Sequence, residues 1–299
     1  MRYLFIYIFL FLAFISLDGQ TSKDNNDGLS ESFYLSFLDK NPDHLETLEA
    51  LGDLYFSDGK WEKSLDFFKK LVNICPENAN YHFKFGGVLA ILAREGSKLK
   101  ALGYLNQAKK AFSNAETLDP NFIQLYWAQV ELYTQLPTFL GGSYEKAWFY
   151  SNKIEALSKI DGYFSKAYIY KQNADLQNFE YFTKKGLDEL FNLECYETDK
   201  QITNNCFFNN NINYQIGIGF DLFKSNFRQA LIFFRKYIQN YTIVDRYSLD
   251  IVYYNVSEIQ LKSGDTKSAI MSLDSALNIN PNYEKAKDMK KEILKKFNK

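Results

Sequence analysis

The sequence predicts an all-α protein, an α-α superhelix of about six antiparallel helical pairs that ends in a C-terminal capping helix. Composition is the first observation, because 5 prolines and 15 glycines in 299 residues are few, as in chains made mostly of helices. The second is one spacing of small residues and prolines that recurs near both ends of the chain. The third is an apolar stripe at helical spacing in the last residues.

The N-terminus predicts a secretory signal peptide. Arg2 is followed by an apolar run at residues 3–15, and more polar residues then begin. A basic start before an apolar run of this length is typical of signal peptides, whereas a transmembrane helix needs a longer run. We expect residues 1–20 to be removed on export to the periplasm or cell envelope, leaving no membrane span; an uncleaved N-terminal anchor is the alternative. Residues 21–30 predict a polar linker before a helical-repeat domain at residues 31–299.

The clearest repeat runs from Leu45 to Asn78. Gly52 in its first helix and Ser64 in its second are small, which indicates that the two helices cross closely at these positions. Phe68 is large and is expected to fill the space beside the crossing. Pro76 closes the repeat because proline cannot continue a helix.

A second repeat with the same spacing runs from Asp250 to Tyr283. Ser257 takes the position of the small residue in the first helix, and Pro281 closes the repeat. The interval from Ser257 to Pro281 equals that from Gly52 to Pro76. Two copies in the same register near opposite ends of the chain indicate a repeat architecture.

This pattern resembles the tetratricopeptide repeat (TPR) family, whose repeats of about 34 residues combine a small residue in the first helix with a closing proline. The resemblance covers roughly residues 30–298 and is strong at both ends and weak between. Less regular helical pairs are expected at residues 86–120, 126–147, 162–190 and 213–237, and a capping helix at residues 282–298.

The middle of the chain also resembles a group of bacterial envelope TPR proteins that share no enzymatic activity. The long unit from Gly86 to Pro120 carries this resemblance, together with Tyr133, Pro137 and the sequence Gly141-Gly142-Ser143. It favours a location in the envelope. The Gly-Gly-Ser segment is interpreted as a turn in which Ser143 caps the next helix, with anion binding by its backbone amides as the alternative.

The resemblance implies that the first helices line a concave face that binds a protein or peptide partner. The partner-binding residues implied by its register are Glu49, Asp53, Phe83, Trp127, Glu131, Tyr254 and Glu258. Three large aromatic side chains on one open face would mark an interaction site. The carboxylates disfavour a partner that presents a C-terminal carboxylate. The alternative function is a small-ligand-binding TPR component of an envelope transport system, which an enclosed pocket near Trp127 and residues 137–143 would favour.

The residue inventory argues against several other classes. With 35 basic and 36 acidic residues, the net charge of −1 gives no general attraction to nucleic acid. We expect no enzyme, cofactor or metal site, because the chain has only two histidines and no recognisable catalytic or phosphate-binding motif. Cys195 and Cys206 flank a polar segment and are a possible disulfide in an oxidising compartment, with free thiols as the alternative.

Overall fold

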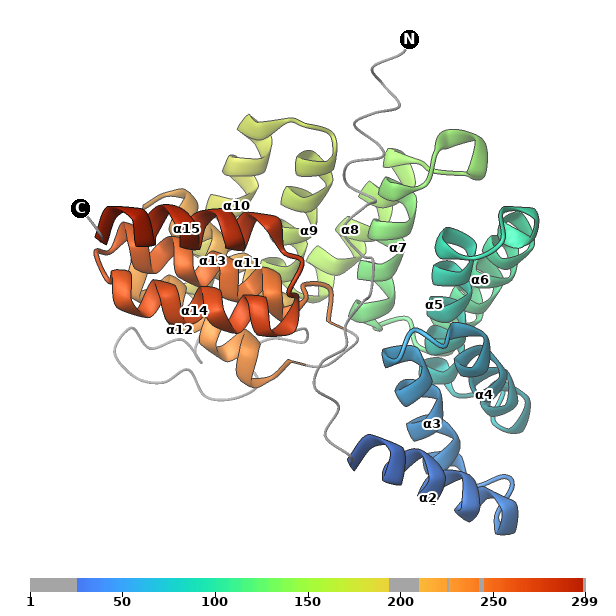
Figure 1. Cartoon of the computed structure of the whole chain (residues 1–299). Coiled ribbons are helices and arrows are strands. Elements are labelled where there is room, and N and C mark those ends of the chain that lie inside the picture. The colour runs from blue at the N-terminus through green and yellow to red at the C-terminus, as the bar shows by residue number, and fades with distance from the viewer. Residues whose placement is uncertain (1–25, 194–209, 225, 242–244, 298–299) are drawn as a thin grey trace. The chain divides into compact units, whose positions relative to one another are not determined.

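A computed structural model describes residues 26–193, 210–224, 226–241 and 245–297. Within these ranges the chain forms 14 α-helices and one short 3-10 helix, and no strand (Figure 1). The all-α prediction is therefore confirmed. The predicted signal peptide and the cysteines of the possible disulfide, Cys195 and Cys206, lie outside the described residues.

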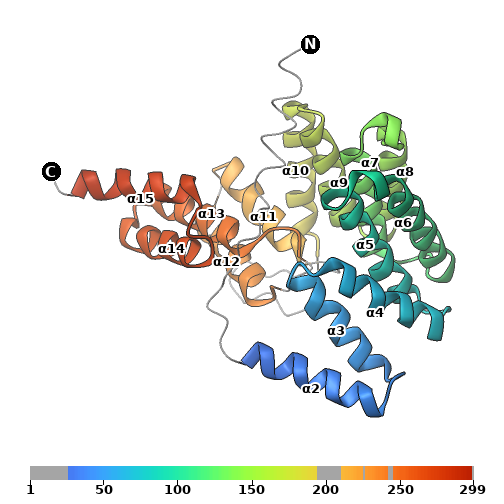
Figure 2. The ribbon, with the colours of Figure 1, turned by 45° about the vertical axis from the view of Figure 1, so that its right-hand side comes forward.

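The helices follow one another as antiparallel hairpins, which Figures 1 and 2 show from two directions. The pairs that pack most extensively are α3 with α4, α5 with α6, α7 with α8, α9 with α10, α11 with α12 and α13 with α14. The first helices of these pairs are α3 (Leu45–Ser57), α5 (Ala79–Glu95), α7 (Ile123–Gln135), α9 (Lys159–Gln172), α11 (Asn211–Leu222) and α13 (Leu249–Lys262). The second helices are α4 (Trp61–Ile74), α6 (Lys98–Leu118), α8 (Tyr144–Leu157), α10 (Leu176–Leu190), α12 (Phe227–Gln239) and α14 (Thr266–Ile279).

Single helices flank the pairs. α2 (Asn26–Lys40) precedes α3, and α15 (Glu284–Phe297) packs on α14 as the expected capping helix. α2 begins inside residues 21–30, so the linker predicted there is wrong over its second half. The described helices fall into two compact units, one at residues 29–248 and one that contains α13–α15.

Local sequence explains where the helices start and end. Polar side chains accept a hydrogen bond from the backbone N–H three residues later at the N-terminus of many helices, which satisfies one of the free donors there. Ser143 does so for Lys146 at 3.2 Å, which confirms the turn interpretation of the Gly-Gly-Ser segment. Gly59 and Gly264 adopt positive φ angles of 69° and 86° just after α3 and α13, where a glycine is the least strained residue.

The close crossing predicted in the first repeat is present. Ser64 is buried and its Oγ donates to the carbonyl oxygen of Gly52 at 2.8 Å. A Cβ atom added to Gly52 would lie 2.8 Å from Cζ of the buried Phe68 ring. The same relation recurs between Gly217 and Phe234, so the small residue of the first helix makes room for an aromatic ring of the second.

The irregular middle of the chain keeps the paired arrangement by changing helix lengths. α5 has 17 residues and α6 has 21, and these longer helices hold the extra residues of the unit between Gly86 and Pro120. The insertion after α7 forms a 3-10 helix, η1 (Thr138–Leu140), and its Leu140 carbonyl oxygen accepts a hydrogen bond from Lys109 Nζ at 3.1 Å.

Two alanine substitutions on first helices test the crossing. Gly52→Ala is expected to lower the free energy of unfolding by about 1–3 kcal/mol, because its methyl group meets the buried Phe68 ring. Gly87→Ala on α5 is the matched control, since a methyl group added there would meet open space. It should raise the stability by about 0.5–1 kcal/mol through the better helix propensity of alanine. Urea unfolding measures the change in the free energy of unfolding for both variants. Equal changes in the two variants would contradict the predicted crossing.

Candidate partner-binding face

A buried cation lies against the first helices α7 and α9. The Arg246 guanidinium is 5.0 Å from the ring centre of Trp127 and 4.7 Å from that of Tyr168, and it forms an ion pair with Glu131. Its side chain is only 15% exposed. A desolvated guanidinium over aromatic faces is attracted by their negative quadrupoles, so the rings and the carboxylate together form a site for a planar cation.

Trp127 is buried in this site. Its side chain is on the first helix α7 as the repeat register predicts, but the residue is only 2% exposed, so its predicted exposure on an open face is wrong. The indole Nε1 donates to Asp161 Oδ1 at 3.2 Å, and Ser158 Oγ donates to Asp161 Oδ2 at 2.7 Å. Burial raises the pKa of Asp161 above its usual range. Neighbouring helices and Arg246 therefore enclose a side chain that the repeat alone would leave open.

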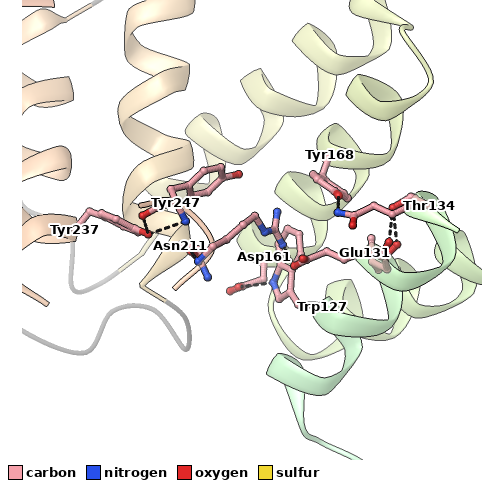
Figure 3. Close-up of polar contacts among 11 residues, drawn as sticks. Trp127, Glu131, Thr134, Asp161, Tyr168, Asn211, Tyr237 and Tyr247 are labelled. Carbon is pink, nitrogen blue, oxygen red and sulfur yellow. Dashed lines mark hydrogen bonds and ion pairs between the residues drawn. The ribbon is translucent and has the colours of Figure 1, made fainter. Parts of the chain in front are cut away.

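The non-helical residues 245–248 carry Arg246, and we call them the Arg246 segment. Figure 3 shows Tyr237 and Tyr247, whose hydrogen bonds hold this segment. The backbone N–H of Arg246 donates to Asn211 Oδ1 at 3.0 Å. Tyr237 Oη accepts from the backbone N–H of Tyr247 at 3.0 Å and donates to its carbonyl oxygen at 2.6 Å. The Tyr247 ring stacks on Tyr214 of α11 at a centroid distance of 3.6 Å. The chain thus places a short non-helical segment of its own on α7, α9 and α11.

The hydrogen bonds of the Arg246 site are incomplete. Nε and Nη1 of Arg246 are buried without a hydrogen-bond partner. Gln135 Nε2 donates to Tyr168 Oη at 2.9 Å, and burial, with the nearby charge of Glu131, raises the pKa of Tyr168 to about 12. The phenol therefore stays neutral, and Glu131 supplies the negative charge for the guanidinium.

A second charged cluster joins α3 and α5, which are the first helices of the first two pairs. Glu49 and Asp53 lie one turn apart on α3, and Lys84 of α5 contacts both carboxylates, at 2.7 and 2.6 Å. Burial raises the pKa of Asp53, while the Lys84 ammonium acts in the opposite direction. The two predicted site residues are therefore brought together, and Lys84 neutralises part of the negative charge expected on this face.

The remaining predicted residues lie elsewhere. Phe83 on α5 is half-buried and packs against Phe112 and Phe122, at ring-centre distances of 6.3 and 5.0 Å. Tyr254 and Glu258 are on α13, in the second compact unit, where Tyr254 Oη donates to Glu258 at 3.3 Å.

Sequence reasoning missed three residues of these clusters. Asp161 is 34 residues after Trp127, so a register carried one repeat forward would have found it. Lys84 lies 31 residues after Asp53 and 35 after Glu49, again close to one repeat. Arg246 lies 115 residues from Glu131 in a connection between pairs, and no repeat signal points to it.

Metal-ligating clusters and membrane-spanning helices are both absent from the described part of the chain. It contains no group of three or more His, Cys, Asp or Glu side chains placed to hold a metal ion. None of its helices is long and apolar enough to cross a membrane.

Successive antiparallel helix pairs with a small-residue crossing define a helical-repeat protein. The family model "Tetratricopeptide repeat" matches residues 251–289, which overlap the second repeat found in the sequence, at residues 250–283. The chain is a tetratricopeptide repeat protein, and such proteins are generally non-catalytic scaffolds.

Solved structures share this fold at low sequence identity. A chain in the crystal structure of the APC/C hetero-tetramer Cut9-Hcn1 is 17% identical, with a TM-score of 0.52 over 90% of this chain. Our chain spans 46% of that protein's length, so the likeness concerns the fold alone. A tetratricopeptide repeat protein from Parabacteroides merdae is 14% identical, with a TM-score of 0.48, and the match covers 89% of this chain and 91% of that one. No curated protein matches the sequence significantly.

Proposed function

We propose that this protein is an exported, non-catalytic scaffold that binds a protein or peptide partner through the face formed by its first helices. TPR proteins bind protein partners, which supports the general role. The apolar run after Arg2 and the resemblance to envelope TPR proteins support export to the periplasm or cell envelope.

The Arg246 segment is the observation that carries the proposal. In it, first helices of this chain hold a short non-helical segment by an ion pair, stacked rings and backbone hydrogen bonds. Aromatic rings, arginine and hydrogen bonds are also prominent where protein interfaces hold a partner. Glu49, Asp53 and Phe83 extend the proposed face onto α3 and α5. Tyr254 and Glu258 are the corresponding residues of α13.

The alternative small-ligand role rested on an enclosed pocket near Trp127 and residues 137–143. The hollow found between α9, α10 and α11 is lined by neither. This hollow therefore does not support the small-ligand role at the place where the sequence predicted it.

Site-specific photo-crosslinking tests the proposed face. Benzoylphenylalanine is introduced at Asp53 on the first helix α3 or at Asp66 on the second helix α4 of the same pair, and envelope extract is irradiated with each variant. Asp53 has a side chain that is 38% exposed, and Asp66 is an exposed aspartate, so the pair is matched in residue type. We expect a discrete crosslinked partner, identified by mass spectrometry, from position 53 alone.

Equal crosslinking at both positions, or crosslinking at position 66 alone, would refute binding through the first-helix face. Circular dichroism of both variants confirms that each retains its helices. Recovery of the full-length precursor in the soluble cytoplasm would separately refute export.

A further inference from the structure

A hollow opens between α9, α10 and α11, within the unit at residues 29–248. The empty space in and around it is about 390 Å³, part of which is open solvent. Its apolar lining comes mainly from Phe164, Ala167, Phe179, Ile218 and the rings of Tyr168, Tyr214 and Tyr247, and its polar lining from Lys171, Thr183 and Gln215. Two of these rings, those of Tyr168 and Tyr247, also lie against the Arg246 guanidinium. The other lining residues are not part of the ion pair between Arg246 and Glu131.

Lys171 brings a cation to this hollow without a matching anion. No carboxylate of the described residues pairs with it, and its Nζ lies 5.5 Å from the ring centre of Phe179. Desolvation by the residues around the hollow lowers the pKa of Lys171. Lys166, earlier in the same helix, differs in forming an ion pair with Glu155.

Gln215 adds an unused donor. Its Nε2 is buried and has no hydrogen-bond partner in the described structure. Thr183 is already engaged, since its Oγ1 donates to the Phe179 carbonyl oxygen at 2.7 Å. A buried donor without an acceptor costs about 1–3 kcal/mol, so an acceptor brought by a ligand would be favoured at this position.

The chemistry of the lining selects the ligand. An ammonium and an amide N–H donate, so the ligand must supply acceptors, and the positive charge of Lys171 repels a cationic ligand. A purely apolar ligand would leave Gln215 Nε2 unpaired. Two donors suit the two oxygens of a carboxylate, and the aromatic walls suit a short apolar chain attached to it.

We propose that this hollow binds a carboxylate attached to a short apolar group, with Lys171 Nζ and Gln215 Nε2 donating to its two oxygens. The carboxylate belongs either to a free small acid or to the C-terminus of a peptide. The site is distinct from the Glu49, Asp53 and Lys84 cluster, and it does not depend on partner binding by the first-helix face.

Butyrate is the probe for the test, with butyramide as the isosteric neutral control and butyramidinium as the isosteric cationic control. Two-dimensional NMR titration of the ¹⁵N-labelled mature protein should show saturable shifts in α9 and α11 with butyrate alone. Lys171→Met and Gln215→Leu should each weaken butyrate binding at least tenfold. Lys184→Met, an exposed lysine of α10 that lines no part of the hollow, should bind as the wild type does.

Thermal melting separates a binding role of Gln215 from a structural one. Gln215→Leu removes a buried donor that has no partner, so its melting temperature without ligand should equal or exceed that of the wild type. A lower melting temperature would show that Gln215 supports the fold and would overturn its assignment. Equal shifts with butyrate and butyramide, or unchanged butyrate binding by Lys171→Met, would overturn the carboxylate site.

A second titration identifies the source of the carboxylate. Acetyl-Ala-Val is added as the free acid and as the C-terminal amide. Tenfold tighter binding of the free acid than of butyrate, with loss of binding for the amide, assigns the site to a peptide C-terminus. Equal or weaker binding than butyrate assigns it to small free acids.

Discussion

Trp127→Ala is expected to lower the free energy of unfolding of the unit at residues 29–248 by about 3–5 kcal/mol. The side chain is 2% exposed, so truncation leaves a cavity beside Arg246 and removes the indole N–H that donates to Asp161. The Asp161 carboxylate is fully buried and would keep only Ser158 as a side-chain donor. Urea unfolding followed by far-UV circular dichroism measures the loss.

Trp127→Phe is the control for this prediction. It keeps an aromatic ring under the Arg246 guanidinium and removes mainly the hydrogen bond to Asp161, so its loss should be about 1–2 kcal/mol. A Trp127→Ala variant that unfolds like the wild type would contradict the burial of this residue. Because Trp127 supports the fold, its truncation cannot report on partner binding by itself.

Glu131→Gln is expected to destabilise the same unit by about 3 kcal/mol. It leaves the Arg246 cation, 15% exposed, without its counter-charge, and removing one member of a buried pair costs far more than the pair contributes. The double variant Glu131→Gln with Arg246→Met should recover much of this loss, because it removes the desolvated charge as well. The two single variants and the double variant form a cycle whose coupling energy is read from urea unfolding.

The sign of the coupling decides the outcome. A double variant more stable than Glu131→Gln alone confirms that the unpaired cation causes the loss. Losses that add independently would show that Arg246 and Glu131 do not interact in solution. Glu145→Gln, an exposed carboxylate of α8, is the control and should change stability by less than about 0.5 kcal/mol.

Much of the fold was predictable because short stretches of sequence determine where the helices end and how the two helices of a pair cross. A glycine such as Gly59 or Gly264 ends a helix through its own backbone freedom, and Pro76 prevents the continuation of α4. The small size of Gly52 and the large size of Phe68 were enough to predict that the two residues pack against each other. The start of α2 was missed because polar residues near Asn26 are compatible with both a linker and a first helical turn.

The candidate site was predictable only where contacts follow the repeat. Equivalent positions of successive repeats lie side by side, so Trp127 and Asp161, 34 residues apart, could have been paired from the register. The exposure of Trp127 could not be predicted from the register, because a residue from a connection between pairs covers its side chain. The possible disulfide between Cys195 and Cys206, and the signal peptide, stay predictions.

The sequence by itself determined that this protein is a helical repeat, where its two clearest repeats begin and end, and which helices come first in each pair. These properties depend on side-chain size, helix propensity and backbone freedom, which act within one repeat. Tertiary structure alone decided that Arg246 contacts Glu131, 115 residues away, and that Lys171 and Gln215 meet at one hollow. The connections between repeats have no periodic constraint, so the position of their side chains depends on the surface that the assembled helices offer.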